Sequence, residues 1–250
     1  MALLAPLFFL TALIYAAAGF GGGSTYTALL ALWTDDVAVI PVVALACNIV
    51  VVSAGVWRFA REGHVDWRRI WPFFAASVPM AFVGGLLPVP RVVFIGLLSA
   101  SLFVAGLLLL WQPKARAGLP PKPYPRWLEP LVGGLLGLLA GIVGIGGGIY
   151  LAPVLHLLRW GSPHAIAGTS AVFILANSLS GLGGQLAKSG SAFGEVLAAH
   201  WLLLPAVLVG GAIGSLLGAK RFDPHWLRVL TGLLILFVSG QLAVRFVALL

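Results

Sequence analysis

Long apolar runs are the feature that most constrains this chain. Its apolar residues fall in stretches of about 20, the length that a helix needs to cross about 30 Å of hydrocarbon. The short alternating strands of an outer-membrane barrel are not the pattern seen. Of 250 residues, 60% are apolar and 9% are charged, whereas soluble domains are about half apolar and a quarter charged. We therefore expect an all-α integral membrane protein, multi-pass and in the cell inner membrane.

Eight apolar segments are separated by polar or proline-rich stretches. The segments run at about 2–33, 37–57, 70–89, 92–111, 129–158, 165–187, 197–219 and 226–249. The stretch at 112–126 contains PPKPYP and several cations, and so many prolines are incompatible with a helix. We therefore expect a first membrane repeat at 1–111, a basic proline-rich linker on the cytoplasmic side at 112–128, and a second membrane repeat at 129–250.

The two halves resemble each other in four landmarks that follow in the same order. GFGGG at Gly19–Gly23 recurs as GIGGG at Gly144–Gly148, and Asn48 with Pro79, Gly84 and Gly85 recurs as Asn177 with Pro205, Gly210 and Gly211. Duplication is typical of secondary transporters, in which the substrate lies between the repeats. Glycines that allow close helix packing are the alternative explanation. The matched Pro79, Gly84, Gly85, Pro205, Gly210 and Gly211 are also candidate hinges.

The first segment of each half is too long for one simple span. Each holds about 30 apolar residues, or about 45 Å of straight helix, and each is interrupted by glycines near its middle. Such a segment is either a discontinuous tilted span or a re-entrant hairpin.

The distribution of cations favours the hairpin. Arginines and lysines place 58–69 and 112–126 in the cytoplasm. If 129–158 were a hairpin, 159–164 and 220–225 would also be cytoplasmic, whereas a full crossing would put the cations near 220 outside. By analogy 2–33 is a hairpin that enters from outside, each half has three further crossings, both termini face outward, and the halves are inverted repeats. Eight conventional spans remain the alternative.

Hairpins from opposite faces would bring their glycine tips together at mid-depth. The half-helices that leave the tips would point free backbone N–H groups and partial positive charge at that point, which suits an anion. The candidate binding residues at these tips are Gly21, Gly22, Gly23, Ser24, Thr25, Gly146, Gly147, Gly148 and Tyr150.

These motifs resemble the TauE/SafE (TSUP-type) sulfite exporter family over nearly the whole chain. The likeness rests on GFGGGS at 19–24, on GIVGIGGGIYLAPVL at 141–155 and on GTSA at 168–171 leading into Asn177. The first half lacks a proline near Ala28 and a GTS before Asn48. The resemblance implies an exporter of small sulfur-containing anions such as sulfite, organosulfonates or thiosulfate, without cofactor or nucleotide.

The polar residues of the apolar segments are compatible with an anion. All seven acidic residues lie at segment ends or in loops, so none offers a cation site deep in the membrane. Amides and hydroxyls that could donate to an anion are Asn48, Thr169, Ser170 and Asn177, with Ser180 and Gln185 nearby. Hydrogen bonding between helices is their ordinary alternative role.

Other functional classes find little support. The net charge of +8 comes largely from two loops, as topology requires, so we expect no nucleic-acid partner. A single cysteine, Cys47, and the absence of a metal-binding or Walker motif predict no metal, no cofactor and no direct use of ATP. GGGS with a distant His156 or His200 is a weak indication of an intramembrane enzyme, and we assign no catalytic residue. An anion channel or uniporter, the identity of the anion and the formation of homo-oligomers stay open.

Overall fold

The computed structural model describes residues 3–17, 21–111, 123–217 and 224–250, and over these residues the chain is entirely α-helical with no strand. The helices are α1 (Leu4–Ala17), α2 (Gly23–Trp33), α3 (Val39–Arg61), α4 (Trp67–Leu86), α5 (Arg91–Trp111), α6 (Leu128–Val143), α7 (Gly148–Leu157), α8 (Pro163–Ser189), α9 (Ala192–Ala199), α10 (Leu203–Leu217) and α11 (Pro224–Ala248). The all-α prediction is confirmed. Most of the predicted linker and of the 220–225 loop lies outside the described residues, as do Gly19 and Phe20.

Five of the described helices are long and apolar enough to cross a membrane, namely α3, α4, α5, α8 and the Thr231–Ala248 part of α11. A sixth crossing results if α9 and α10, which meet at a 59° bend, form one span. Helices α1, α6 and α7 are apolar but shorter, and α2 has 11 residues. The chain is therefore a multi-pass membrane protein, with fewer candidate spans than apolar segments.

Glycines with left-handed backbone conformations lie between α6 and α7 and directly before α2. Helix α6 ends at Val143, and Gly144, Gly146 and Gly147 then take φ values of +85°, +82° and +79° before α7 begins. Gly22, with φ +84°, comes directly before α2. Residues with a Cβ rarely adopt this left-handed conformation, so the chain leaves the helix where the glycines permit it.

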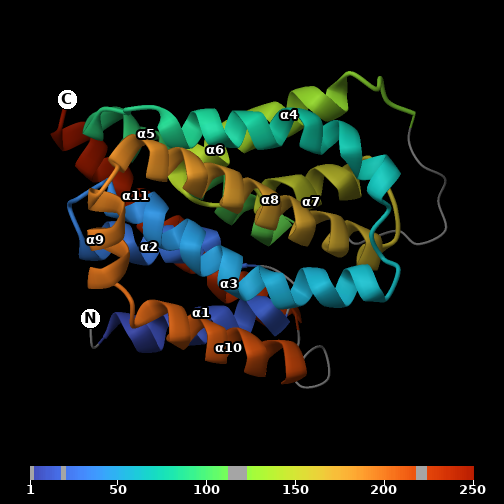
Figure 1. The fold of residues 1–250 in the computed structure, drawn as a ribbon, viewed down its shortest axis with the longest axis horizontal. Coiled ribbons are helices and arrows are strands. Elements are labelled where there is room, and N and C mark those ends of the chain that lie inside the picture. Colours follow the sequence, from blue (N-terminus) through green and yellow to red (C-terminus); the bar gives the residue numbers. More distant parts are fainter. Residues whose placement is uncertain (1–2, 18–20, 112–122, 218–223) are drawn as a thin grey trace.

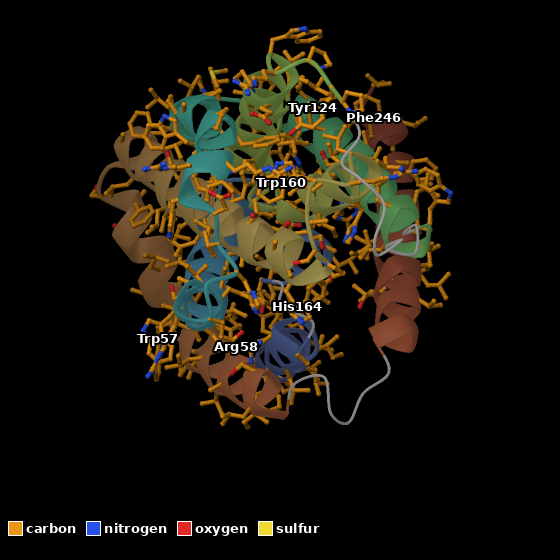
Figure 2. The ribbon with its side chains drawn as sticks, turned by 90° about the vertical axis from the view of Figure 1, so that its right-hand side faces the viewer. Trp57, Arg58, Tyr124, Trp160, His164 and Phe246 are labelled. Atoms are coloured by element: carbon orange, nitrogen blue, oxygen red, sulfur yellow. The ribbon has the colours of Figure 1, made fainter. Side chains whose placement is uncertain are left out.

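Loops that are distant in sequence gather at the two ends of the molecule (Figure 1). At one end, which faces the viewer in Figure 2 with Trp160 and His164 labelled, the guanidinium of Arg69 lies 4.4 Å from the ring centroid of Trp160, and the rings of His64 and His164 are 5.2 Å apart. At the opposite end, Arg91 and Arg245 both approach Asp35. Tyr124 lines a pocket with Arg69, so the chain before α6, at Tyr124, and the chain after α7, at Trp160, lie at the same end.

Helices from the first half pack along helices from the second. Helix α4 lies along α6, α1 along α10, α5 along α11 and α3 along α8. Gly133, Gly137 and Gly141 of α6 face backbone carbonyls of α4 so closely that an added Cβ would overlap them. Small residues at every fourth position let two backbones meet, which is how membrane helices associate. The halves thus form one interlocked bundle.

Candidate functional site

A small cavity lies where the two glycine segments meet. Its volume is about 30 Å³, room for about one water molecule. Gly21, Gly22, Gly23 and Ser24 line it from the first segment, Ile145 and Ile149 line it from the second, and Tyr15, Leu109, Ala152 and Ile174 complete most of its wall. Gly21–Ser24 therefore share a cavity with Ile145 and Ile149, whereas Gly146, Gly147 and Gly148 are not among its lining residues.

Asn48 of α3 lies between the two tips and contacts both. Its side chain is fully buried, and Nδ2 donates to the Ile145 carbonyl at 3.4 Å. A Cβ added to Gly21 would stand 2.9 Å from Oδ1, and one added to Gly146 would stand 3.0 Å from Nδ2. Within the described part of the chain, Oδ1 has no hydrogen-bond partner. Asn48 therefore brings an unused acceptor and an amide donor to the centre of the site.

Ile174, rather than Asn177, occupies the matching position on α8. The side chain that faces Gly23 is Asn48, and the side chain that faces Gly148 is Ile174. Asn48 and Ile174 are 126 residues apart, the separation that also relates Pro79 to Pro205. The interpretation that pairs Asn48 with Asn177 therefore does not describe these contacts. At this position the α3 residue is polar and the α8 residue is apolar.

Ser178 is a residue at the site that sequence reasoning missed. A Cβ on Gly146 would lie 3.2 Å from Ser178 Oγ, and this buried hydroxyl has no partner among the described residues. The sequence offered one indication of this role. Ser178 follows Val52 by 126 residues, the separation of the repeats, and the Val52 side chain lies against Gly21. A serine in a long apolar segment is too common to stand out without that contact.

The hydroxyl groups near the tips are partly engaged in other contacts. Tyr15 OH lies 2.9 Å from Thr25 Oγ1 and 3.3 Å from Ser24 Oγ. Tyr150 OH donates to the Ser101 carbonyl at 2.8 Å, which ties α7 to α5. Tyr15 therefore joins the candidate site, while the Tyr150 hydroxyl makes a contact between helices.

With this geometry in place, the chain can be compared with known proteins. The family model described as "Sulfite exporter TauE/SafE" matches residues 4–242. The chain belongs to this family. It is also 37% identical over 240 residues, 95% of each chain, to the "Probable membrane transporter protein y4hK" of Sinorhizobium fredii (strain NBRC 101917 / NGR234). No solved structure matches it. The resemblance inferred from the glycine motifs is confirmed, and the chain is a membrane transporter.

In this TauE/SafE transporter, α8 carries several buried polar atoms that lack partners within the described residues. They are Thr169 Oγ1, Ser170 Oγ, Ser178 Oγ, both amide atoms of Asn177 and Oε1 of Gln185. Their spacing of seven or eight residues repeats about every two helical turns. Gln185 Nε2 donates to the Gly141 carbonyl at 3.2 Å, and Ser180 donates to the Val78 carbonyl. Thr169, Ser170 and Asn177 are not among the residues that line the described cavity.

The candidate hinge glycines of the TauE/SafE bundle make close packing contacts. A Cβ on Gly84, Gly85 or Gly210 would overlap a backbone carbonyl of a neighbouring helix, whereas Gly211 has ordinary contacts with Val51. Pro79 lies inside α4. Pro205 lies in the first turn of α10, just beyond the 59° bend. Packing is thus their observed role, and movement at these positions stays a prediction.

Cys47 and His200, the candidates for other chemistry, lie in ordinary helical surroundings. Cys47 is buried within α3, and His200 Nδ1 lies 2.9 Å from the Val196 carbonyl, within hydrogen-bonding distance. Among the described residues, no group of three His, Cys, Asp or Glu side chains could hold a metal ion.

Proposed function

We propose that this transporter exports small sulfur-containing anions such as sulfite, sulfonates or thiosulfate, bound between the two glycine tips. One observation carries the proposal: the buried Asn48 faces Gly23, where α2 begins, and hydrogen-bonds Ile145, which lies three residues before the start of α7. The first N–H groups of a helix have no acceptor within it. Two helix starts and an amide therefore supply oriented donors to one point.

Electrostatics favours an anion at this point over a cation. Each helix N-terminus carries a partial positive charge that stabilises an anion by about 0.3–2 kcal/mol. The one ionisable carboxyl among the described residues that is buried, Glu129, belongs to the first turn of α6 and hydrogen-bonds Tyr124, away from the cavity. A sulfur oxyanion accepts hydrogen bonds through several oxygens, which matches the free N–H groups at the two helix starts.

We further propose that α1–α2 and α6–α7 are re-entrant hairpins in two inverted repeats. Contacts at one end support this topology, because Arg69 lies on Trp160 and lines a pocket together with Tyr124. A full crossing by α6–α7 would separate Tyr124 from Trp160 by the thickness of the membrane. The six candidate crossings, three in each half, also agree with it. In this topology 58–69 and 159–164 are cytoplasmic.

The cavity is too small for the proposed substrate, since about 30 Å³ admits one water. An anion must therefore enter a different arrangement of the same tips. Apolar side chains from α7 and α8 fill the remaining space, and Ile149 and Ile174 line it. Separation of the two hairpins would enlarge the site, as alternating access between repeats requires.

Counterflow in proteoliposomes tests the proposed function. Purified protein in vesicles preloaded with unlabelled sulfite should accumulate labelled sulfite, and thiosulfate or taurine should compete if sulfonates and sulfur oxyanions share the site. Sulfate and chloride serve as control competitors. If chloride inhibited the accumulation of label but none of the sulfur compounds did, the proposed substrate class would be wrong.

A further inference from the structure

A second polar site lies at the end of the bundle that carries the 62–66 and 159–162 loops. It is an open pocket of about 450 Å³ between the beginnings of α4 and α6. Arg68, Arg69, Arg126, Tyr124 and Glu129 line it. Figure 2 views the molecule from this end, with Tyr124 and Trp160 labelled. The pocket shares no lining residue with the cavity at the glycine tips, so it needs a separate explanation.

The charges of this arginine pocket favour an anion. Three arginines and one glutamate line it. Arg68 and Arg69 belong to the first turn of α4, and Arg126 precedes α6 by two residues, so the partial positive charges of two helix starts add to theirs. Guanidinium groups bind phosphate through paired hydrogen bonds, which makes phosphate oxygens well suited to such a pocket.

Contacts beneath the pocket hold its walls in place. The Arg69 guanidinium stacks on the buried Trp160 at 4.4 Å from the ring centroid. Tyr124 OH donates to Glu129 Oε1 at 2.6 Å. Burial raises the pKa of Tyr124 to about 12, and the hydrogen bond to Glu129 acts in the same direction. The arginine pocket is therefore a built feature rather than a set of unrelated surface cations.

Exposed tryptophans place the arginine pocket at the membrane surface. Trp67, Trp71 and Trp127 are 58%, 68% and 62% exposed, and they flank Arg68, Arg69 and Arg126 in the sequence. Tryptophan at helix ends is enriched at the depth of the lipid headgroups. Phosphate groups of lipids lie at this same depth.

We infer that the arginine pocket binds the phosphate of an anionic phospholipid in the leaflet on this side of the membrane. Basic pockets between membrane helices are suited to acidic headgroups. A glycerol or diphosphatidyl headgroup presents phosphate without a balancing cation, whereas choline or ethanolamine would bring a positive charge toward three arginines. The flanking tryptophans favour a lipid over a free anion, because they keep the pocket beside the acyl chains. The site is independent of the substrate proposed above.

Lipid retention by the purified full chain tests this inference. The protein is exchanged into mixed micelles that contain phosphatidylglycerol or phosphatidylcholine, and bound lipid is counted by native mass spectrometry. The double variant Arg69→Gln/Arg126→Gln should retain phosphatidylglycerol about tenfold more weakly than the wild type. Phosphatidylcholine retention should be low and equal in both.

Arg61→Gln is the matched control, because Arg61 also stacks on a tryptophan at this end, 5.3 Å from the Trp57 ring centroid, but lies outside the pocket. It should retain phosphatidylglycerol as the wild type does. Equal losses in the control and the double variant would overturn the site. If the double variant fails to fold, Arg126→Gln alone, which removes no described stacking contact, should still lower retention.

Inorganic phosphate tests whether the arginine pocket binds the phosphate of a lipid or a free phosphate ion. Millimolar phosphate without lipid should raise the thermal stability of the wild type much less than phosphatidylglycerol does. If phosphate stabilises as strongly and phosphatidylglycerol adds nothing, the pocket binds a soluble anion and the lipid inference is wrong. Unchanged phosphatidylglycerol retention in a folded double variant would overturn it as well.

Discussion

The side-chain amide of Asn48 donates to the backbone carbonyl of Ile145, 97 residues away, so a residue of the first half contacts the tip of the second. Both groups are buried, and an unpaired buried polar group is costly. Because Asn48 also faces Gly23 and Gly146 of the proposed site, Asn48→Leu should weaken sulfite binding by about 1–3 kcal/mol, measured by sulfite-dependent thermal stabilisation. Asn177→Leu should have a smaller effect, because Ile174 occupies the matching position. Equal losses in both variants would restore the Asn48–Asn177 pairing.

Gly23→Ala should block the junction of the tips. The added Cβ would stand 2.5 Å from the Ile145 carbonyl oxygen and still closer to Asn48 Nδ2, and overpacking of this kind costs about 1–3 kcal/mol. We expect loss of sulfite counterflow in a protein that still inserts. Gly55→Ala is the control, since a Cβ there meets nothing within 4 Å. Wild-type counterflow in Gly23→Ala would show that the anion binds elsewhere.

Cysteine labelling should distinguish hairpins from eight conventional spans. In a Cys47→Ala background, an impermeant thiol reagent added outside should label Ser191→Cys but not Gly161→Cys. Both positions are exposed, and they lie beyond opposite ends of α8. Cys47 is the single cysteine of the chain, so after its replacement the introduced cysteine is the one thiol that the reagent can label. Labelling of Gly161→Cys from outside would contradict the proposed orientation of the second hairpin.

If Pro79 and Pro205 act as hinges, replacing them should change the rate of sulfite transport rather than the affinity for sulfite. Pro79 lies inside α4 and leaves one helical carbonyl without its usual donor, and Pro205 follows the bend between α9 and α10. Pro79→Ala and Pro205→Ala should slow sulfite counterflow while the half-saturating concentration changes less than about threefold. Wild-type rates in both variants would leave packing as their whole role.

Asp35, which follows α2, contacts arginines of α5 and α11 at the end opposite to the arginine pocket. Its Oδ1 accepts from Arg91 at 2.9 Å and lies 3.6 Å from Arg245, which also donates to the Ala31 carbonyl. These groups are solvent-accessible, so Asp35→Asn should change the free energy of unfolding by less than about 1 kcal/mol. Because such pairs are screened by salt, the difference from the wild type should shrink at high ionic strength. A salt-independent loss would point to a packing effect.

The sequence alone was sufficient for the features that depend on local pattern. Apolar runs near 20 residues predict membrane helices because the helical rise and the bilayer thickness are general quantities. The glycine clusters predict where helices end, because Gly22, Gly144, Gly146 and Gly147 adopt φ values that other residues avoid. The family resemblance rests on these same motifs.

Contacts across the bundle were decided by the tertiary structure. The sequence presents Asn48, Asn177, Tyr150 and Ser178 as similar polar residues in apolar segments, and only packing sends Asn48 between the tips while Tyr150 bonds to Ser101. The arginine pocket likewise joins residues near 68 with residues near 126 through the packing of α4 on α6. Helix propensity and hydrophobic length are properties of neighbouring residues. Which side chains meet depends on helix rotation and register, which are determined by close contacts between distant segments.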